Sequence, residues 1–335
     1  MSNDTDVLAD QSTPATIAIG TALGVTALPG LGCNLLLLYA LAKEGVIGES
    51  SPVVYRFMYN LLIVDSFQLG LIPAYLAPAS ALQSWLLPKW AWEMPGNFEL
   101  TNWYEMWMML TAIAVNRCIA VQSKSQASLL THSMANKIIA TTWILSISMC
   151  MTTQYIIPCC RYYVYYKVFA YGYPFSNGNT NWADYIVEIP CNTGSSLIII
   201  ICYLLVLVRV RKHRKQVSVN DAAEQQRKAQ EMRITIQFVV ISFAFIFVWV
   251  FLRIYCLIVP TDTVKPFSIL AFSVIFNSSI NGILYIRYNE KVSEAVCATL
   301  KIKRAPAPVQ SVGKKATNGT GTNTVSAQPV TTGQA

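Results

Sequence analysis

Charged side chains are scarce in this chain of 335 residues, because Asp, Glu, Lys and Arg together make up only 13% of it. Hydrophobic residues account for 54%, and the mean hydropathy is positive. A typical soluble domain has about a quarter of its residues charged. The composition therefore excludes an ordinary soluble domain and indicates a membrane protein.

Histidine occurs only twice, at His132 and His213. A membrane hydrolase or desaturase needs clustered histidines for its metal, so the sequence predicts no enzyme and no metal site. A retinal protein needs a lysine in the middle of its last span, and the nearest lysine, Lys265, precedes Pro266 at the outer end of that span. No internal repeat is visible, which disfavours a transporter. A transporter or channel and a non-signalling membrane scaffold remain the alternatives, and no cofactor is expected.

Apolar windows of about 20 residues predict seven membrane spans and therefore an all-α membrane protein built as a seven-transmembrane helix bundle. The predicted spans are Ile17–Leu41, Val53–Pro78, Glu99–Val121, Lys137–Ile157, Gly194–Val210, Ile234–Val259 and Phe267–Ile286. We expect residues 17–300 to form this domain, with an extracellular tail at 1–16 and a disordered cytoplasmic tail at 301–335.

The net charge of +8 would fit nucleic acid if the chain were soluble, but most of the basic residues lie in loops on one side of the predicted bundle. The cluster from Arg209 to Lys215 is the densest of these, whereas the opposite loops hold only four basic residues. Because positive loops stay in the cytosol, we expect an outer N-terminus and a multi-pass protein of the plasma membrane. We expect membrane lipid as a partner and no nucleic acid. No cleavable signal peptide is visible. Asn3 heads a glycosylation sequon on the outer side.

The third predicted span is the most polar, since it carries Glu99, Asn102 and Glu105 in its outer half and Asn116 and Arg117 at its inner end. A charge at bilayer depth costs at least a few kcal/mol unless it faces the bundle interior. We therefore expect this helix to be the central one, with its outer half lining a cavity.

The segment Pro158–Pro190 is predicted to be a long outer loop rich in aromatic residues, and part of it alternates like a short hairpin. Such a loop either covers the mouth of the bundle or anchors it at the membrane interface. Cys191 is predicted to pair with Cys159 or Cys160, because these three cysteines lie in the oxidising space outside the cell.

An amphipathic stretch follows the last span, with Val292, Val296 and Leu300 on one stripe. We expect it to form a short eighth helix along the inner interface. Cys297 beside it is a palmitoylation candidate.

Several spaced motifs together resemble the rhodopsin-like seven-transmembrane G-protein-coupled receptors. They lie on six predicted spans and are Asn34, Asn60-Leu61 with Asp65, Asn116-Arg117-Cys118, Trp143, Phe245 with Trp249, and the run Asn277–Tyr285 reading NSSINGILY. The resemblance implies a receptor that binds an extracellular small molecule and activates a heterotrimeric G protein by outward movement of its sixth helix.

The sequence departs from that family at four places. Asn116 replaces the usual acid, Phe251 and Gly282 stand where prolines are usual, and Trp92 falls near the usual third-helix cysteine. The departures resemble a divergent branch such as the invertebrate, nematode-type serpentine chemoreceptors.

The resemblance assigns a G-protein coupling and switch role to residues at the inner end. It places Arg117 beside Asn116, with Glu231 as an ionic partner for Arg117. It gives Tyr203 and Tyr285 water-bridged hydroxyl groups and counts Asn281 among the switch residues.

The resemblance also implies a central polar network of Asn34, Asp65, Asn277 and Asn281. Relatives bind sodium at such an aspartate, but Met106 stands where they have a hydroxyl residue.

The ligand site is predicted in the outer half, at Glu99, Trp103, Trp249 and Arg253. Glu99 and Arg253 either form a buried ion pair with each other or bind opposite ends of a polar ligand, and pairing is favoured in the empty state because an isolated buried charge is costly.

Overall fold

The computed structural model describes residues 12–122, 130–157, 161–173, 180–214, 222–259 and 265–302, with side chains except at 210–214 and 222–231. The chain divides into the unit Met1–Ile302 and the segment Lys303–Ala335. The glycosylation candidate Asn3 and nearly all of the predicted C-terminal tail lie outside the described residues.

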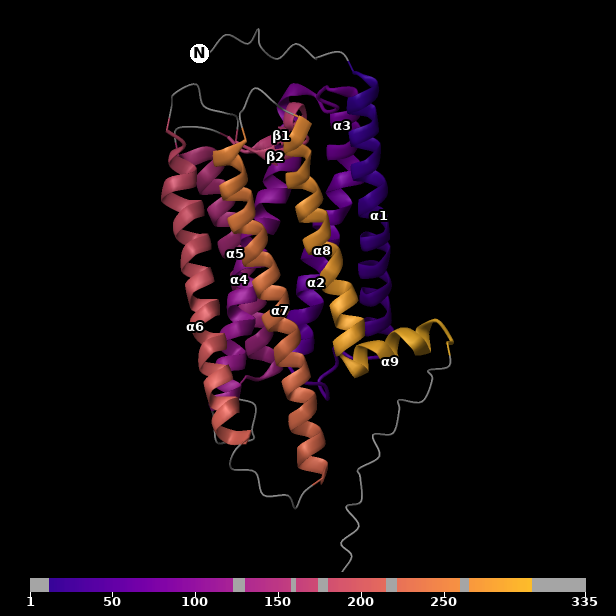
Figure 1. The fold of residues 1–335 in the computed structure, drawn as a ribbon, viewed down its shortest axis with the longest axis vertical. Coiled ribbons are helices and arrows are strands. Elements are labelled where there is room, and N and C mark those ends of the chain that lie inside the picture. The colour runs from indigo at the N-terminus through magenta and orange to yellow at the C-terminus, as the bar shows by residue number, and fades with distance from the viewer. Residues whose placement is uncertain are drawn as a thin grey trace, which may run out of the picture. The chain divides into compact units, whose positions relative to one another are not determined.

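Seven long helices form the bundle (Figure 1). Six of them are long and apolar enough to cross a membrane, and the seventh is the polar helix α4. The predicted seven-helix architecture is therefore confirmed. The helices are α1 (Pro14–Lys43), α2 (Val54–Leu71) with its continuation α3 (Ala77–Leu82), α4 (Met94–Gln122), α5 (His132–Met151), α6 (Ile189–Arg214), α7 (Ala222–Ile258) and α8 (Ser268–Tyr288).

Helix α4 is the central helix, because it packs against α2, α5, α6 and α7. Its side chains Glu99, Asn102 and Glu105 are at most 4% exposed. Their polar groups thus face protein rather than lipid, as the sequence predicts, and the desolvation cost is offset by hydrogen bonds to neighbouring helices.

Gly30 of α1 and Gly282 of α8 allow these two helices to approach closely. A Cβ atom at Gly30 would lie 2.0 Å from the Ser279 hydroxyl oxygen, and one at Gly282 would lie 2.4 Å from Oδ1 of Asn34. Small residues at such contacts are typical of helix pairs in membranes. The glycine at position 282, which departs from the family pattern, therefore has a packing reason.

In the described residues, three of the spans contain a π-helical turn near the end of the bundle where α1 begins, at Ile72–Leu76, Thr152–Ile156 and Asp184–Glu188. This end is called outer and the opposite end inner, as in the orientation expected from the sequence. The last of the three turns corrects the prediction, because helical structure of the fifth span begins at Asp184 rather than at Gly194. Hydropathy missed this extension because Asp184 and Glu188 are charged, and their charges are matched only by a residue of another helix.

The predicted hairpin is confirmed between α5 and α6. Strands β1 (Tyr163–Tyr165) and β2 (Ala170–Gly172) pair antiparallel, with Val164 opposite Tyr171. Val164 and Phe169 are at most 1% exposed, and they pack among side chains of α1, α2 and α8. The hairpin lies at the end of the bundle where α1 begins (Figure 1), and it covers that end rather than extending away from it.

The predicted amphipathic helix is also confirmed. Helix α9 (Glu290–Thr299) begins at Asn289, whose side chain accepts a hydrogen bond from the backbone N–H of Val292. Val292, Ala295 and Val296 are buried against the bundle. Figure 1 shows α9 running across the direction of α8, as expected for a helix lying along a membrane surface.

Candidate ligand and coupling sites

Four aromatic side chains form a cluster where α4 meets α7. The Phe245 ring lies 5.0 Å from Trp103 and 4.6 Å from Trp107, and Trp249 meets Trp107 edge to face at 6.0 Å. The two predicted ligand residues in this cluster, Trp103 and Trp249, are partly buried. Trp107 is fully buried. Sequence reasoning missed Trp107, although its spacing of four residues from Trp103 places both on one face of α4.

Glu99 lies in the outer half of α4 and is 4% exposed. Its Oε1 accepts a hydrogen bond of 3.1 Å from the Gln68 side chain of α2. Tyr162, which precedes β1, also interacts with Glu99, and burial together with the Glu99 carboxylate raises the pKa of Tyr162 well above its ordinary value. Glu99 is thus held by neutral donors.

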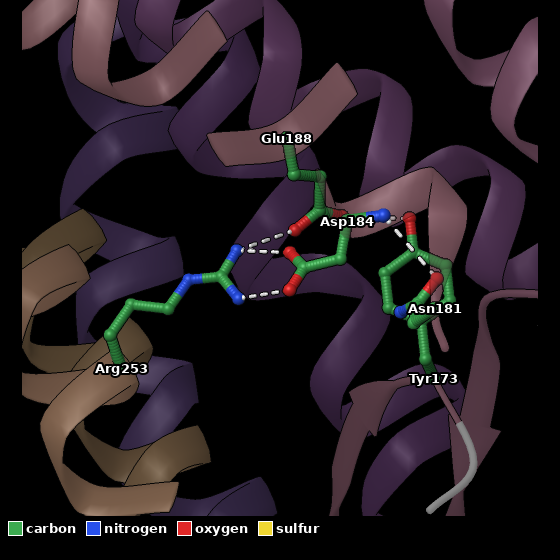
Figure 2. A network of polar contacts seen from close by, with 5 residues as sticks. All are labelled: Tyr173, Asn181, Asp184, Glu188 and Arg253. Atoms are coloured by element: carbon green, nitrogen blue, oxygen red, sulfur yellow. Dashed lines mark hydrogen bonds and ion pairs between the residues drawn. The ribbon is translucent and has the colours of Figure 1, made fainter. Parts of the chain in front are cut away.

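Arg253 does not pair with Glu99, so that prediction is wrong. Figure 2 shows its guanidinium facing two acids of the π-helical turn before α6. Nη1 and Nη2 bind the two carboxylate oxygens of Asp184 at 2.7 and 2.5 Å, and Nη2 binds Glu188 at 3.1 Å. The fork of donors on arginine suits this bidentate geometry, and the two acids lie on one face of the turn beside α7.

Tyr173, at the end of the hairpin, joins this ion triad of Arg253, Asp184 and Glu188. Its hydroxyl donates a hydrogen bond of 2.8 Å to Glu188 (Figure 2). The triad therefore links the hairpin, the outer end of α6 and the outer half of α7. Sequence reasoning missed Tyr173, Asp184 and Glu188, although two acids four residues apart just before an apolar span were a visible signal.

The hairpin is fixed to α4 and α5 by non-covalent contacts. Gln154 donates to the carbonyl oxygen of Tyr162 at 2.7 Å and accepts from its N–H at 2.8 Å. Gly96 lets the strand approach, since a Cβ atom there would lie 2.6 Å from the same carbonyl oxygen. Arg161 pairs with Glu93 near the start of α4, and this contact raises the pKa of Arg161.

The predicted disulfide at Cys191 is not formed in this structure, because Cys191 is a free thiol. Cys191 lies in the first turn of α6 rather than in the outer loop where the sequence places it. Its candidate partners Cys159 and Cys160 lie outside the described residues. The contacts at Gln154 and Gly96 hold the loop where the resembled family has a disulfide.

Glu105 forms a second buried polar cluster, between α2, α4 and α5. Its Oε1 accepts hydrogen bonds of 3.0 Å from Asn60 and from Thr142, and its Oε2 accepts one of 3.1 Å from Ser146. Trp143 donates to Oδ1 of Asn60 at 3.0 Å. Three helices are thus joined through one fully buried carboxyl group. The sequence identified Glu105 only as one of the polar residues in the outer half of the third span.

The structure joins two of the four predicted members of the central polar network, Asp65 and Asn281, directly. Asn281 donates to Asp65 at 2.9 Å, and Asn34 donates to the carbonyl oxygen of Ser278 at 3.1 Å. Asn277 instead points its amide at the Met106 sulfur, 3.8 Å away. Sodium binding at Asp65 stays a prediction, and it fits this surrounding poorly because a hard cation requires oxygen ligands where Met106 offers a thioether.

At the inner end, Phe238 of α7 lies between two predicted switch residues. Its ring centre is 5.9 Å from the Arg117 guanidinium carbon and 6.2 Å from the Tyr285 ring. Tyr203 and Tyr285 are at most 1% exposed and belong to the same hydrophobic cluster as Phe238. Phe238 was not predicted, because nothing in its local sequence distinguishes it from other apolar residues of the span.

Three other predicted residues remain, namely Asn116, Glu231 and Cys297. Asn116 lines a groove of about 500 Å³ between α4 and α5, among apolar residues such as Met134 and Ile138. The Glu231 side chain lies outside the described residues, so its pairing with Arg117 stays a prediction. Cys297 is a half-buried thiol on α9, and its palmitoylation also stays a prediction.

A sequence model of the serpentine type 7TM GPCR chemoreceptor Srx family matches residues 25–289. A crystal structure of squid rhodopsin matches with a TM-score of 0.71 over 87% of each chain at 20% sequence identity, which shows the shared fold. The curated proteins include no significant match. Since the family model covers most of the chain, this protein belongs to the Srx family of serpentine seven-transmembrane G-protein-coupled chemoreceptors.

Proposed function

We propose that this receptor binds a small extracellular molecule in the outer half of its bundle and activates a heterotrimeric G protein through α7. One observation carries the proposal: side chains along α7 contact in turn the outer acids Asp184 and Glu188, the aromatic cluster of α4 and the inner switch residue Arg117. Arg253 belongs to the ion triad at the outer end, Trp249 and Phe245 contact Trp107 of α4 in the middle, and Phe238 contacts Arg117 at the inner end.

The ligand site is proposed between Glu99, Trp103, Trp249 and Arg253, with Asp184, Glu188 and Tyr173 as added members. A ligand that changes the partners of Arg253 or displaces Trp249 would favour a different packing of α7. Binding then acts as a population shift between two arrangements of the bundle. The inner half of α7 would move outward, releasing Arg117 for the G protein.

The orientation needed for this role has the N-terminus outside the cell and α9 at the cytoplasmic face. It is supported by the basic residues of the loops on the α9 side. The ligand enters from the side covered by the hairpin, so the hairpin has to open or the ligand has to pass beside it.

The test compares basal and ligand-library-stimulated G-protein activation in plasma membranes. We expect Arg117→Ala to lower stimulated nucleotide exchange by about tenfold or more, since it removes a charged hydrogen-bonding group from the proposed coupling surface. Arg287→Ala changes the same charge at an exposed position on α8 and should leave activation unchanged. Surface expression of each variant has to equal that of the wild type.

Stimulation lost with Arg117→Ala and kept with Arg287→Ala would support the proposal. Failure of the wild type to engage any G protein would overturn it and favour a non-signalling receptor-like scaffold. Ligand-dependent flux across the membrane would instead indicate a transporter or channel.

A further inference from the structure

A second amphipathic groove lies between α2 and α5, away from the ligand site. Its volume is about 330 Å³. Ile47, Ile63 and Ile139 supply apolar walls, and Arg56 and Asn136 supply polar groups. Arg56 lies in the first turn of α2 and Asn136 in the first or second turn of α5, so both are at the same membrane surface.

Arg56 has no carboxylate partner among the residues that the structure describes. Its Nη1 donates a hydrogen bond of 2.8 Å to the Asn136 side chain, which is neutral. Its Nε is buried and has no hydrogen-bond partner in the described part of the chain. Within the described residues, no carboxylate therefore neutralises this guanidinium, which lies beside an apolar groove.

A groove with apolar walls and a cation at its polar end matches the two parts of an anionic phospholipid. Acyl chains fit against isoleucine side chains, and a phosphate accepts two parallel hydrogen bonds from a guanidinium. Basic pockets between transmembrane helices are known to bind acidic headgroups. We propose that this groove binds one anionic glycerophospholipid, with its phosphate on Arg56.

The site also reaches the buried cluster around Glu105. Asn60 lines the groove and donates to Glu105, while Trp143 donates to Asn60. A bound lipid therefore packs against the junction of α2, α4 and α5 and should raise its thermal stability. Lipid binding in this groove does not depend on the proposed signalling. In the proposed orientation the groove faces the inner leaflet.

The test measures lipid binding to the full-length protein in detergent by native mass spectrometry, with phosphatidylglycerol and phosphatidylcholine as probes. We expect the wild type to prefer phosphatidylglycerol, and Arg56→Gln to lower that preference about fivefold, the effect of one basic residue near an acidic lipid. Arg287→Gln removes an equal charge from an exposed site on α8 and should leave the preference unchanged. Ile63→Trp fills the groove with Arg56 intact and should also weaken phosphatidylglycerol binding.

Equal loss with Arg56→Gln and Arg287→Gln would overturn the proposal, because it would show attraction to surface charge in general. Unchanged phosphatidylglycerol binding in Ile63→Trp would overturn it too. Arg56→Lys keeps the positive charge without the paired N–H donors of the guanidinium, so it should retain part of the preference for phosphatidylglycerol. It replaces Arg56→Gln in the test if that variant does not fold. Complete loss of phosphatidylglycerol binding in folded Arg56→Lys, together with unchanged binding in Ile63→Trp, would likewise contradict the proposed site.

Discussion

Arg253 of α7 binds both carboxylate oxygens of Asp184, at 2.7 and 2.5 Å, across 69 residues of sequence. The Arg253 side chain is 35% exposed, whereas those of Asp184 and Glu188 are 17% and 10% exposed. Because the two carboxylates are more buried than Arg253, they are the groups that need the ion pair to offset their loss of hydration. This relationship fixes the outer half of α7 to the outer end of α6.

Arg253→Met should lower the thermal stability of the ligand-free receptor, because it leaves two largely buried carboxylates without a cation. Breaking a fully buried pair costs about 3–5 kcal/mol, and we expect about 2 kcal/mol here because Arg253 is partly solvated. The measurement is thermal unfolding in detergent of Arg253→Met, Asp184→Asn and the double variant. A double variant with the summed loss of the single ones would show that the pair contributes no coupling energy.

Phe238→Ala should raise basal G-protein activation. The substitution removes the ring that contacts Arg117 and Tyr285, so the inner half of α7 is held less firmly. The matched control is Phe247→Ala on the same helix, because Phe247 is 70% exposed to the lipid side. Constitutive nucleotide exchange at equal surface expression measures the effect, and an equal rise in both variants would point to a general loosening of α7.

Gln154→Leu should loosen the hairpin, since it removes two hydrogen bonds to the backbone of Tyr162 and one of 2.6 Å to Asn97. We expect a loss of about 1–3 kcal/mol and faster amide exchange in residues 161–173. Thr152→Val, which alters a partly buried residue of the same turn that bonds only within its own helix in the described structure, should leave the exchange rates unchanged. Unchanged hairpin exchange in Gln154→Leu would show that other contacts hold this segment.

Glu105→Gln should be tolerated better than Glu105→Leu. Glutamine keeps an oxygen for Asn60 and Thr142 and can donate to Ser146, whereas leucine leaves these buried groups unpaired at about 1–3 kcal/mol each. Melting temperatures of the two purified variants test this. Equal losses would mean that the cluster requires the carboxyl group itself.

Gly282→Ala should destabilise the contact of α1 with α8, because the new Cβ would lie 2.4 Å from Oδ1 of Asn34. Overpacking of this kind costs about 1–3 kcal/mol. Gly70→Ala on α2 is the control, since a Cβ atom there meets nothing within 4 Å and alanine favours the helix. The melting temperature should therefore fall in Gly282→Ala and stay the same or rise in Gly70→Ala.

Much of the fold could be predicted because its signals are local in sequence. The seven spans, the hairpin, the amphipathic helix and the central place of α4 follow from hydropathy, alternation and charge within single segments. The fifth span is the exception, because Asp184 and Glu188 read as loop residues until Arg253 is brought beside them. A local window contains no information about such a partner.

The sequence by itself thus determined the architecture and the family, since both depend on which segments prefer lipid and on motifs spaced along single helices. The tertiary structure decided which polar groups meet. In it, Arg253 pairs with Asp184 and Glu188, and Glu99 accepts a hydrogen bond from Gln68. Phe238 lies beside Arg117. The physical reason is that a buried charge or ring selects among partners from several helices by distance and direction, and these depend on helix rotation, π-helical turns and close contacts at glycine.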